Sequence, residues 1–167
     1  MAKQININLS SDFDDYGIHL NFDDYGVLLY YAYTIDNIKS LQLYNSTINE
    51  YTYRTNNNIL LENLTELDYG SHSTNEELTL VIDFIENNLI PNLEGLPSDL
   101  DLVESWNIDG DLDVFFYNQG SFFQNFLIDN IDTEGFTPPY LIEILYRFGE
   151  LFKRVISENS TYFIRIE

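Results

Sequence analysis

The chain has 167 residues and a formal net charge of −21, with 28 aspartate and glutamate residues against seven lysine and arginine residues. Hydrophobic residues make up 44% of it and aromatic residues 16%, which excludes a disordered acidic tail because such tails are poor in aromatic side chains. The absence of cysteine excludes a disulfide framework and a thiol nucleophile, and the length is typical of a single domain covering residues 1–167.

The first third of the chain predicts β-strands, because apolar and polar residues alternate there with a period of two. Ile5, Ile7 and Leu9 show this alternation, and it returns at residues 18–22. His19 lies between two apolar residues of the second segment, so we expect its side chain on the solvated face of a strand.

A continuous apolar run from Val27 to Tyr33 is typical of a strand buried on both faces, and residues 41–43 and 50–53 predict further short strands. The segment Phe-Asp-Asp-Tyr-Gly occurs twice, at residues 13–17 and 22–26. Because Asp and Gly favour turns, we interpret both copies as turns between strands of a meander rather than as a recognition motif.

The best-defined helix is predicted to begin after Thr74, which forms a capping box with Glu77. Apolar residues then recur at helical spacing from Leu78 to Leu89, and Pro91 is predicted to end the helix. The segment before it, residues 59–67, fits either a strand or a short helix.

Residues 100–108 and 112–117 flank Asp109-Gly110-Asp111 and predict a β-hairpin. A three-residue loop would place the apolar side chains on one face and the polar ones on the other. Alternate residues of a strand lie about 6.6–6.8 Å apart, an interval comparable to that between successive phosphates of a nucleic-acid strand. We therefore expect rows of carboxylates from two pairs, Asp99 with Asp101 and Asp111 with Asp113.

The last third predicts a helix over residues 121–131, a second helix beginning at Pro138, and a strand over residues 162–166. The expected fold class is α+β: a mostly antiparallel sheet covered by two or three helices in a single compact domain. The buried side of the last helix is predicted to consist of Leu141, Leu145, Phe148, Phe152 and Val155.

Catalytic motifs are absent from the sequence. The two histidines, His19 and His72, are read as strand and loop residues, and no metalloprotease, serine hydrolase, phosphate-binding or dinucleotide-binding motif is present. Residues 107–113 resemble a calcium loop, but Ser105 and Phe116 occupy the positions of its first and last ligands. We therefore expect a protein that is not an enzyme and binds neither a metal nor a cofactor.

Basic residues are missing from most of the chain. No lysine or arginine lies between Arg54 and Arg147, whereas residues 55–146 contain eighteen aspartate and glutamate residues. The abundance of Asn, Ile, Tyr and Phe indicates an AT-rich coding sequence from a low-GC bacterium or one of its phages. Lysine codons are also AT-rich, so we interpret the lack of lysine as avoidance of positive charge rather than as mutational bias.

Location and direct ligands are also constrained. Residues 1–10 lack the apolar region of a secretory signal, and no run approaches the roughly 18 apolar residues of a membrane helix. We expect a cytoplasmic location, in a bacterial cell or a phage-infected host. The acidity argues against direct binding to nucleic acid or anionic membranes, because both require Lys and Arg.

These observations predict a stoichiometric inhibitor that mimics DNA and binds the basic channel of a bacterial defence enzyme, in the manner of an anti-CRISPR or anti-restriction protein. In charge, size and lack of catalytic motifs the chain resembles phage anti-defence proteins. The alternatives are an immunity protein or antitoxin that neutralises a basic nuclease toxin, and a small carboxylate-dependent hydrolase. Tyr16 and Tyr25 are further aromatic candidates for the interface. The predicted partner-binding residues are Asp99, Asp101, Glu104, Asp109, Asp111, Asp113, Phe115 and Tyr117.

Overall fold

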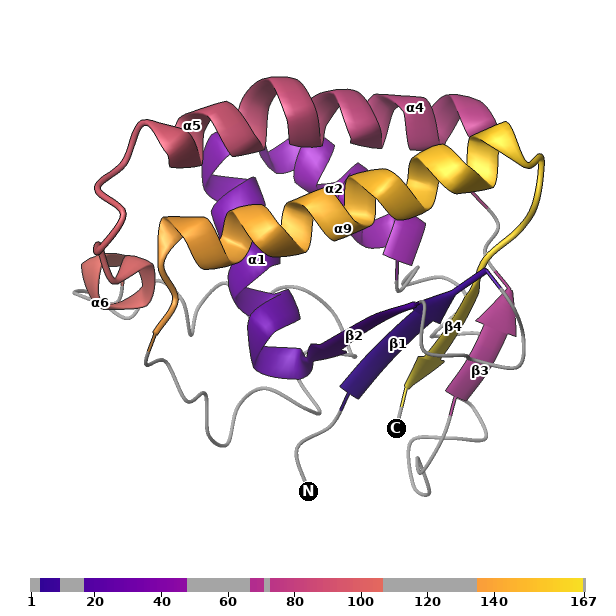
Figure 1. Ribbon diagram of the computed structural model, residues 1–167, viewed down its shortest axis with the longest axis horizontal. Coiled ribbons are helices and arrows are strands. Elements are labelled where there is room, and N and C mark those ends of the chain that lie inside the picture. Colours follow the sequence, from indigo (N-terminus) through magenta and orange to yellow (C-terminus); the bar gives the residue numbers. More distant parts are fainter. Residues whose placement is uncertain (1–3, 10–16, 48–66, 71–72, 107–134, 167) are drawn as a thin grey trace.

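The computed structural model describes residues 4–9, 17–47, 67–70, 73–106 and 135–166. These residues form an α+β fold with a four-stranded sheet, and the helices lie on one side of that sheet (Figure 1). In chain order the elements are β1 (Gln4–Asn8), β2 (Ile18–Asn21), α1 (Phe22–Ile35), α2 (Asn37–Thr47), β3 (Leu67–Gly70), α4 (Asn75–Phe84), the π-helical turn η1 (Ile85–Leu89), α5 (Ile90–Glu94), α6 (Leu102–Trp106), α9 (Pro138–Ser157) and β4 (Phe163–Ile166).

The sheet has the order β2-β1-β4-β3, and each neighbouring pair of strands is antiparallel. Ile7 lies between Ile18 of β2 and Ile164 of β4, and all three side chains are buried in the core. The alternation at residues 5–9 and 18–22 therefore correctly predicted two strands, and the strand predicted at 162–166 is confirmed as β4.

Residues 27–33 form the middle of helix α1, so the strand predicted there is wrong. Val27, Leu28, Leu29 and Ala32 are all buried, because the sheet, α2 and η1 leave this helix little solvent-facing surface. A helix that is buried on almost all sides has a continuous run of apolar residues, as a strand buried on both faces does. A short apolar run therefore fits either element. The strand predicted at residues 41–43 is also wrong, since these residues belong to α2, where Leu43 is buried and Leu41 and Gln42 face solvent.

The second copy of the repeated segment is not a turn. Asp23 and Asp24 lie in the first turn of α1, where negative charge favours the helix dipole. The first copy lies outside the described residues except for Gly17. A Cβ atom at Gly17 would lie 2.5 Å from the carbonyl oxygen of Ile7, so the close approach to β1 requires glycine here.

Helix α4 begins with the predicted capping box: Glu77 N–H donates to Thr74 Oγ1 (3.2 Å), and Thr74 N–H donates to Glu77 Oε2 (2.9 Å). The helix does not end at Pro91 but continues through η1 into α5. A proline inside a helix clashes with the carbonyl four residues earlier. The π-helical turn directly before Pro91 widens the helix and relieves this clash; Ile90 N–H there donates to Ile85 O, five residues back.

Helix α9 confirms the prediction for the last helix. It begins with Pro138 after the N-cap residue Thr137, and the five residues predicted to line its buried side are all buried. It packs against α4 and α5, which form the outer layer opposite the sheet (Figure 1). The ring of Phe152 lies 5.9 Å from that of Phe148 and 5.5 Å from that of Tyr162, which joins α9 to the approach to β4.

Candidate acidic interaction surface

Three of the predicted partner-binding residues lie at and before helix α6, not on a hairpin. Asp101 is the N-cap of this helix and accepts a hydrogen bond from Glu104 N–H (3.0 Å). Leu102 and Val103 are both buried, which a strand with one solvated face does not allow. The strand predicted over residues 100–106 is therefore wrong, and Asp99 and Asp101 do not form a row at strand spacing.

The other residues singled out in the sequence divide into those that the structure describes and those that lie outside the described residues. Tyr25 is completely buried, and its hydroxyl forms a hydrogen bond with Thr47 Oγ1, so the expectation that it faces outward is wrong. His19 is exposed on β2, as predicted, and its Nδ1 lies 2.6 Å from Asn6 Oδ1. Outside the described residues lie Tyr16, His72, Asn107, Asp109, Asp111, Asp113, Phe115, Phe116 and Tyr117, the helix predicted at 121–131, and the segments 50–53 and 59–66.

The continuous helix from α4 to α5 contributes further carboxylates. Glu76 and Asp83 lie on the same side of α4, because residues seven apart are separated by two helical turns. Leu80 lies between them with 54% of its surface exposed, and Asn87 continues the row by donating to Asp83 Oδ1 (2.6 Å). We define the acidic surface by the exposed or half-exposed carboxylates of this helix, α6 and their connection that have no cationic partner: Glu76, Glu77, Asp83, Glu94, Asp99, Asp101 and Glu104. Glu86 of η1 is left out because it pairs with Lys153.

The positive charges of α9 pair with carboxylates of α9, of its C-terminal end and of η1. Arg147 pairs with Glu143 (2.5 Å), and Lys153 pairs with Glu86 of η1 and with Glu150. The contact with Glu86 raises the pKa of Lys153, which keeps the ammonium charged. Each pair joins groups that are about half exposed, so it contributes at most about 1 kcal/mol to stability.

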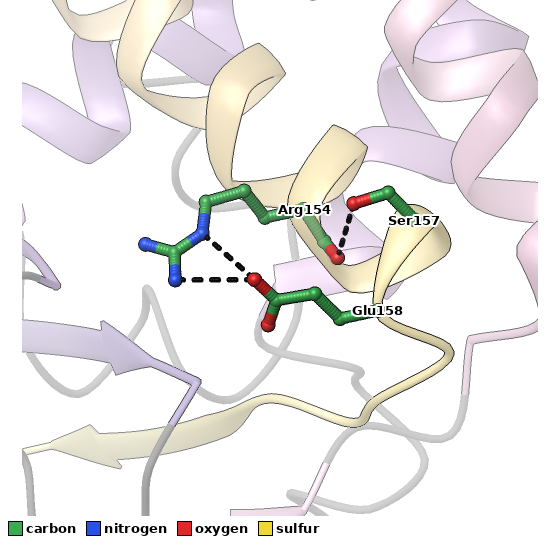
Figure 2. Close-up of polar contacts among 3 residues, drawn as sticks. All are labelled: Arg154, Ser157 and Glu158. Carbon is green, nitrogen blue, oxygen red and sulfur yellow. Dashed lines mark hydrogen bonds and ion pairs between the residues drawn. The ribbon is translucent and has the colours of Figure 1, made fainter.

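Figure 2 shows the third cation of α9. Both Nε and a terminal nitrogen of Arg154 donate to Glu158 Oε1, at 3.4 and 3.3 Å, and Ser157 Oγ donates to the carbonyl oxygen of Arg154 (3.2 Å). Lys39 lies 5.8 Å from the ring centre of Phe84. Among the residues that the structure describes, no Lys or Arg therefore lies within 4.0 Å of a carboxylate of the acidic surface.

Asp24 is chemically distinct from these exposed carboxylates. Burial raises its pKa, although a hydrogen bond from Tyr140 (3.0 Å) acts in the opposite direction. Burial and the neighbouring Asp24 raise the pKa of Tyr140 to about 12. Asp24 and Tyr140 connect the first turns of α1 and α9, so this pair is a structural contact between two helices.

Helical spacing was the sequence feature that could have identified Glu76, Leu80 and Asp83, since the helix that carries them was correctly predicted. In the described part of the chain, no three acidic or histidine side chains are arranged to hold a metal ion. No helix in the same part is long and apolar enough to cross a membrane. No protein-family model matches the chain, and no significant match was found among curated proteins or among solved structures.

Proposed function

We propose that the protein is a stoichiometric inhibitor whose acidic surface binds the basic nucleic-acid channel of a bacterial defence enzyme. One observation carries the proposal: of the eight exposed or half-exposed carboxylates on the helix from α4 to α5, on α6 and on their connection, Glu86 alone has a Lys or Arg within 4.0 Å among the described residues. Clustered carboxylates repel one another and weaken the folded state. Lysine and arginine of a partner would relieve that repulsion on binding.

The geometry suggests how such binding would be divided between charge and apolar contact. Exposed carboxylates mainly accelerate the encounter with a basic partner and select against acidic ones. Buried apolar groups near the centre of an interface usually provide most of its binding energy. Leu80, exposed between Glu76 and Asp83, is the apolar group that the described acidic surface offers for that role.

The test is inhibition of an enzyme recovered by affinity capture. The protein is used as bait in lysate of a low-GC bacterium, and bound proteins are eluted with increasing salt. The recovered enzyme is then assayed for nucleic-acid binding with and without the inhibitor. We expect complete inhibition near a one-to-one ratio, reversed by salt because exposed charges are screened within about 8–10 Å at ordinary ionic strength.

Competition with DNA distinguishes the proposal from its main alternative. A mimic and DNA should exclude each other from the enzyme, whereas an immunity protein bound beside a nuclease active site would leave DNA bound while blocking cleavage. An enzyme that binds the protein but retains full nucleic-acid binding and full activity would overturn both readings.

A further inference from the structure

Helix α2 is the exception to the acidic character of the molecule. It contains Lys39 and no aspartate or glutamate, whereas every other helix in the described part of the chain contains at least one. Its buried side consists of Ser40, Leu43, Tyr44, Ser46 and Thr47. Its solvent-facing side, called here the α2 face, consists of Asn37, Ile38, Leu41, Gln42 and Asn45.

The α2 face is apolar at its centre. Ile38 is 71% exposed and Leu41 is 51% exposed, and residues three apart on a helix are neighbours on its surface. Ile38 is the most exposed large hydrophobic side chain among the described residues. The uncharged amides of Asn37, Gln42 and Asn45 surround this pair.

Among the described residues, the charged neighbours of the α2 face along the chain are Asp36 and Lys39, and both make contacts of their own. Asp36 is the residue before α2, and its Oδ1 accepts hydrogen bonds from Ile38 N–H and Lys39 N–H, both at 3.0 Å. The Lys39 ammonium lies 5.8 Å from the centre of the Phe84 ring of α4. A basic partner therefore finds little attraction here, and its natural target is the acidic surface.

From this distribution of charge we infer that the α2 face is where two copies of the protein associate, in an antiparallel pair of α2 helices. Two molecules that each carry a charge of −21 repel each other, and the repulsion is smallest where neither presents a carboxylate. A two-fold axis between Ile38 and Leu41 would place Ile38 of one copy against Leu41 of the other. Asp36 of each copy would then lie opposite Leu43 of the other helix rather than opposite another carboxylate.

The size of the α2 face limits the strength of this association. Eleven residues of helix extend about 16 Å, and one such face buries less than the roughly 1,200 Å² of a typical stable interface. The dimer is therefore weak and forms at high protein concentration. Salt should strengthen it by screening the repulsion between the copies, whereas binding of the proposed basic partner should weaken with salt.

Sedimentation equilibrium of the full chain tests the inference, at about 0.5 mM protein in about 0.05 M and about 0.5 M NaCl. We expect the weight-average mass to rise with salt from 19.6 kDa toward twice that value and not beyond. The double variant Ile38→Gln/Leu41→Gln should remain at the monomer mass in both buffers. The matched control Leu80→Gln removes an equally exposed leucine from the acidic surface, and it should dimerise like the parent protein.

A second variant keeps the test independent of any effect on folding. Gln42→Glu/Asn45→Glu leaves Ile38 and Leu41 in place and adds charge only at exposed positions, and it should weaken association at least tenfold. A parent protein that stays at 19.6 kDa in both buffers overturns the inference. A salt-dependent dimer that both α2 variants still form, or that Leu80→Gln abolishes, overturns it as well. Retention of a different protein on the α2 face without any self-association would also count against it.

Discussion

The hydroxyl of Tyr31 in α1 donates to the main-chain carbonyl oxygen of Leu89, at the end of the π-helical turn, over a distance of 2.9 Å. The same hydroxyl lies 3.0 Å from Asn92 Oδ1, and its surroundings raise the pKa of Tyr31 by burial. The irregular part of the outer helix is therefore held by a buried side chain of the helix beneath it. The contact gives the carbonyl oxygen at the end of the π-helical turn a side-chain donor from α1.

Removing this hydroxyl should destabilise the protein. The change Tyr31→Phe removes this hydrogen bond to the Leu89 carbonyl, and the loss of one such bond costs about 0.5–1.5 kcal/mol. Urea unfolding followed by circular dichroism would measure it. The control Tyr146→Phe removes a hydroxyl from an exposed tyrosine and should change stability by less than about 0.5 kcal/mol. Equal effects of the two changes would contradict the bracing role of Tyr31.

The capping box of α4 should be measurable in the same way. Thr74→Ala removes the acceptor for Glu77 N–H and should cost about 1 kcal/mol, or about 2–4 °C in Tm. Thr79→Ala is the matched change inside the helix, where alanine favours helix formation and Tm should not fall. An equal fall in Tm in both variants would show that the capping box does not stabilise the protein beyond the effect of replacing any threonine of this helix.

Two glycines should respond to the same substitution with opposite signs. Gly149 lies in the middle of α9, and a Cβ atom there would meet no described atom within 4 Å. Gly149→Ala should therefore stabilise the helix by about 0.5–1 kcal/mol. Gly17→Ala should destabilise the protein, because its Cβ would lie 2.5 Å from Ile7 O. Thermal unfolding of both variants checks the pair, and a stabilised Gly17→Ala would contradict the packing of residue 17 on β1.

Asp24 should make stability depend on pH. Its folded-state pKa is raised above the ordinary 3.8, so the native state binds the proton more tightly and the group costs stability at pH above that pKa. The cost disappears below about pH 3.8, where Asp24 is protonated in both states. Asp24→Asn retains an acceptor for Tyr140, and it should raise Tm near pH 7 by about 1–3 °C and leave it unchanged near pH 3.

The control for this experiment is Asp99→Asn, which removes the same charge from an exposed position. Measurements on either side of the isoelectric point of about 4.1 avoid precipitation. If Asp99→Asn raised Tm at neutral pH as much as Asp24→Asn, general charge repulsion rather than burial of Asp24 would explain the gain.

Once a partner is identified, the acidic surface should control how fast it binds. The triple variant Glu76→Gln/Asp83→Asn/Glu94→Gln should reduce the association rate about tenfold at low salt, with a smaller effect on dissociation. Asp101 is left intact because it caps α6. Stopped-flow or biosensor kinetics would measure both rates.

The control carries the same net charge on a different surface. Glu143→Gln/Glu150→Gln/Glu158→Gln removes three carboxylates of α9 and its C-terminal end that have cationic neighbours. It should reduce the association rate less than the first variant. Equal reductions would mean that net charge alone, and not the place of the acidic surface, determines the encounter.

Local chemistry decided which parts of the fold the sequence predicted. The capping box at Thr74 and the proline at the start of α9 act within one turn of helix, so their meaning does not depend on distant residues. The alternation of Ile5 and Ile7 with Asn6 and Asn8 in β1 is also local, because it depends only on neighbouring residues, although all four are buried in the fold. Helix α1 was mistaken for a strand because burial on almost all sides removed the polar residues that reveal a helical period.

The negative charge of the candidate site was predictable from the sequence, but the positions of its residues in the fold were not. The lack of Lys and Arg between residues 55 and 146 is visible in the sequence, whereas Asp99 and Asp101 were placed on a strand because Leu100 and Leu102 alternate with them. The alternative, an N-cap at Asp101 followed by two adjacent buried residues, depends on a core that forms only in three dimensions. The uncharged face of α2 was not predicted, because the strand expected there covered residues 41–43 alone and left Ile38 outside any element.

The order of strands also affects how the protein is made. The two inner strands of the sheet, β1 and β4, come from residues 4–8 and 163–166, so β1 leaves the ribosome long before its central partner is synthesised. Until then β1 can form backbone hydrogen bonds with β2 but not with β4, and a two-stranded hairpin is at best marginally stable in water. The sheet is therefore completed after translation of β4, and the strong negative charge keeps the waiting nascent chains from associating with one another.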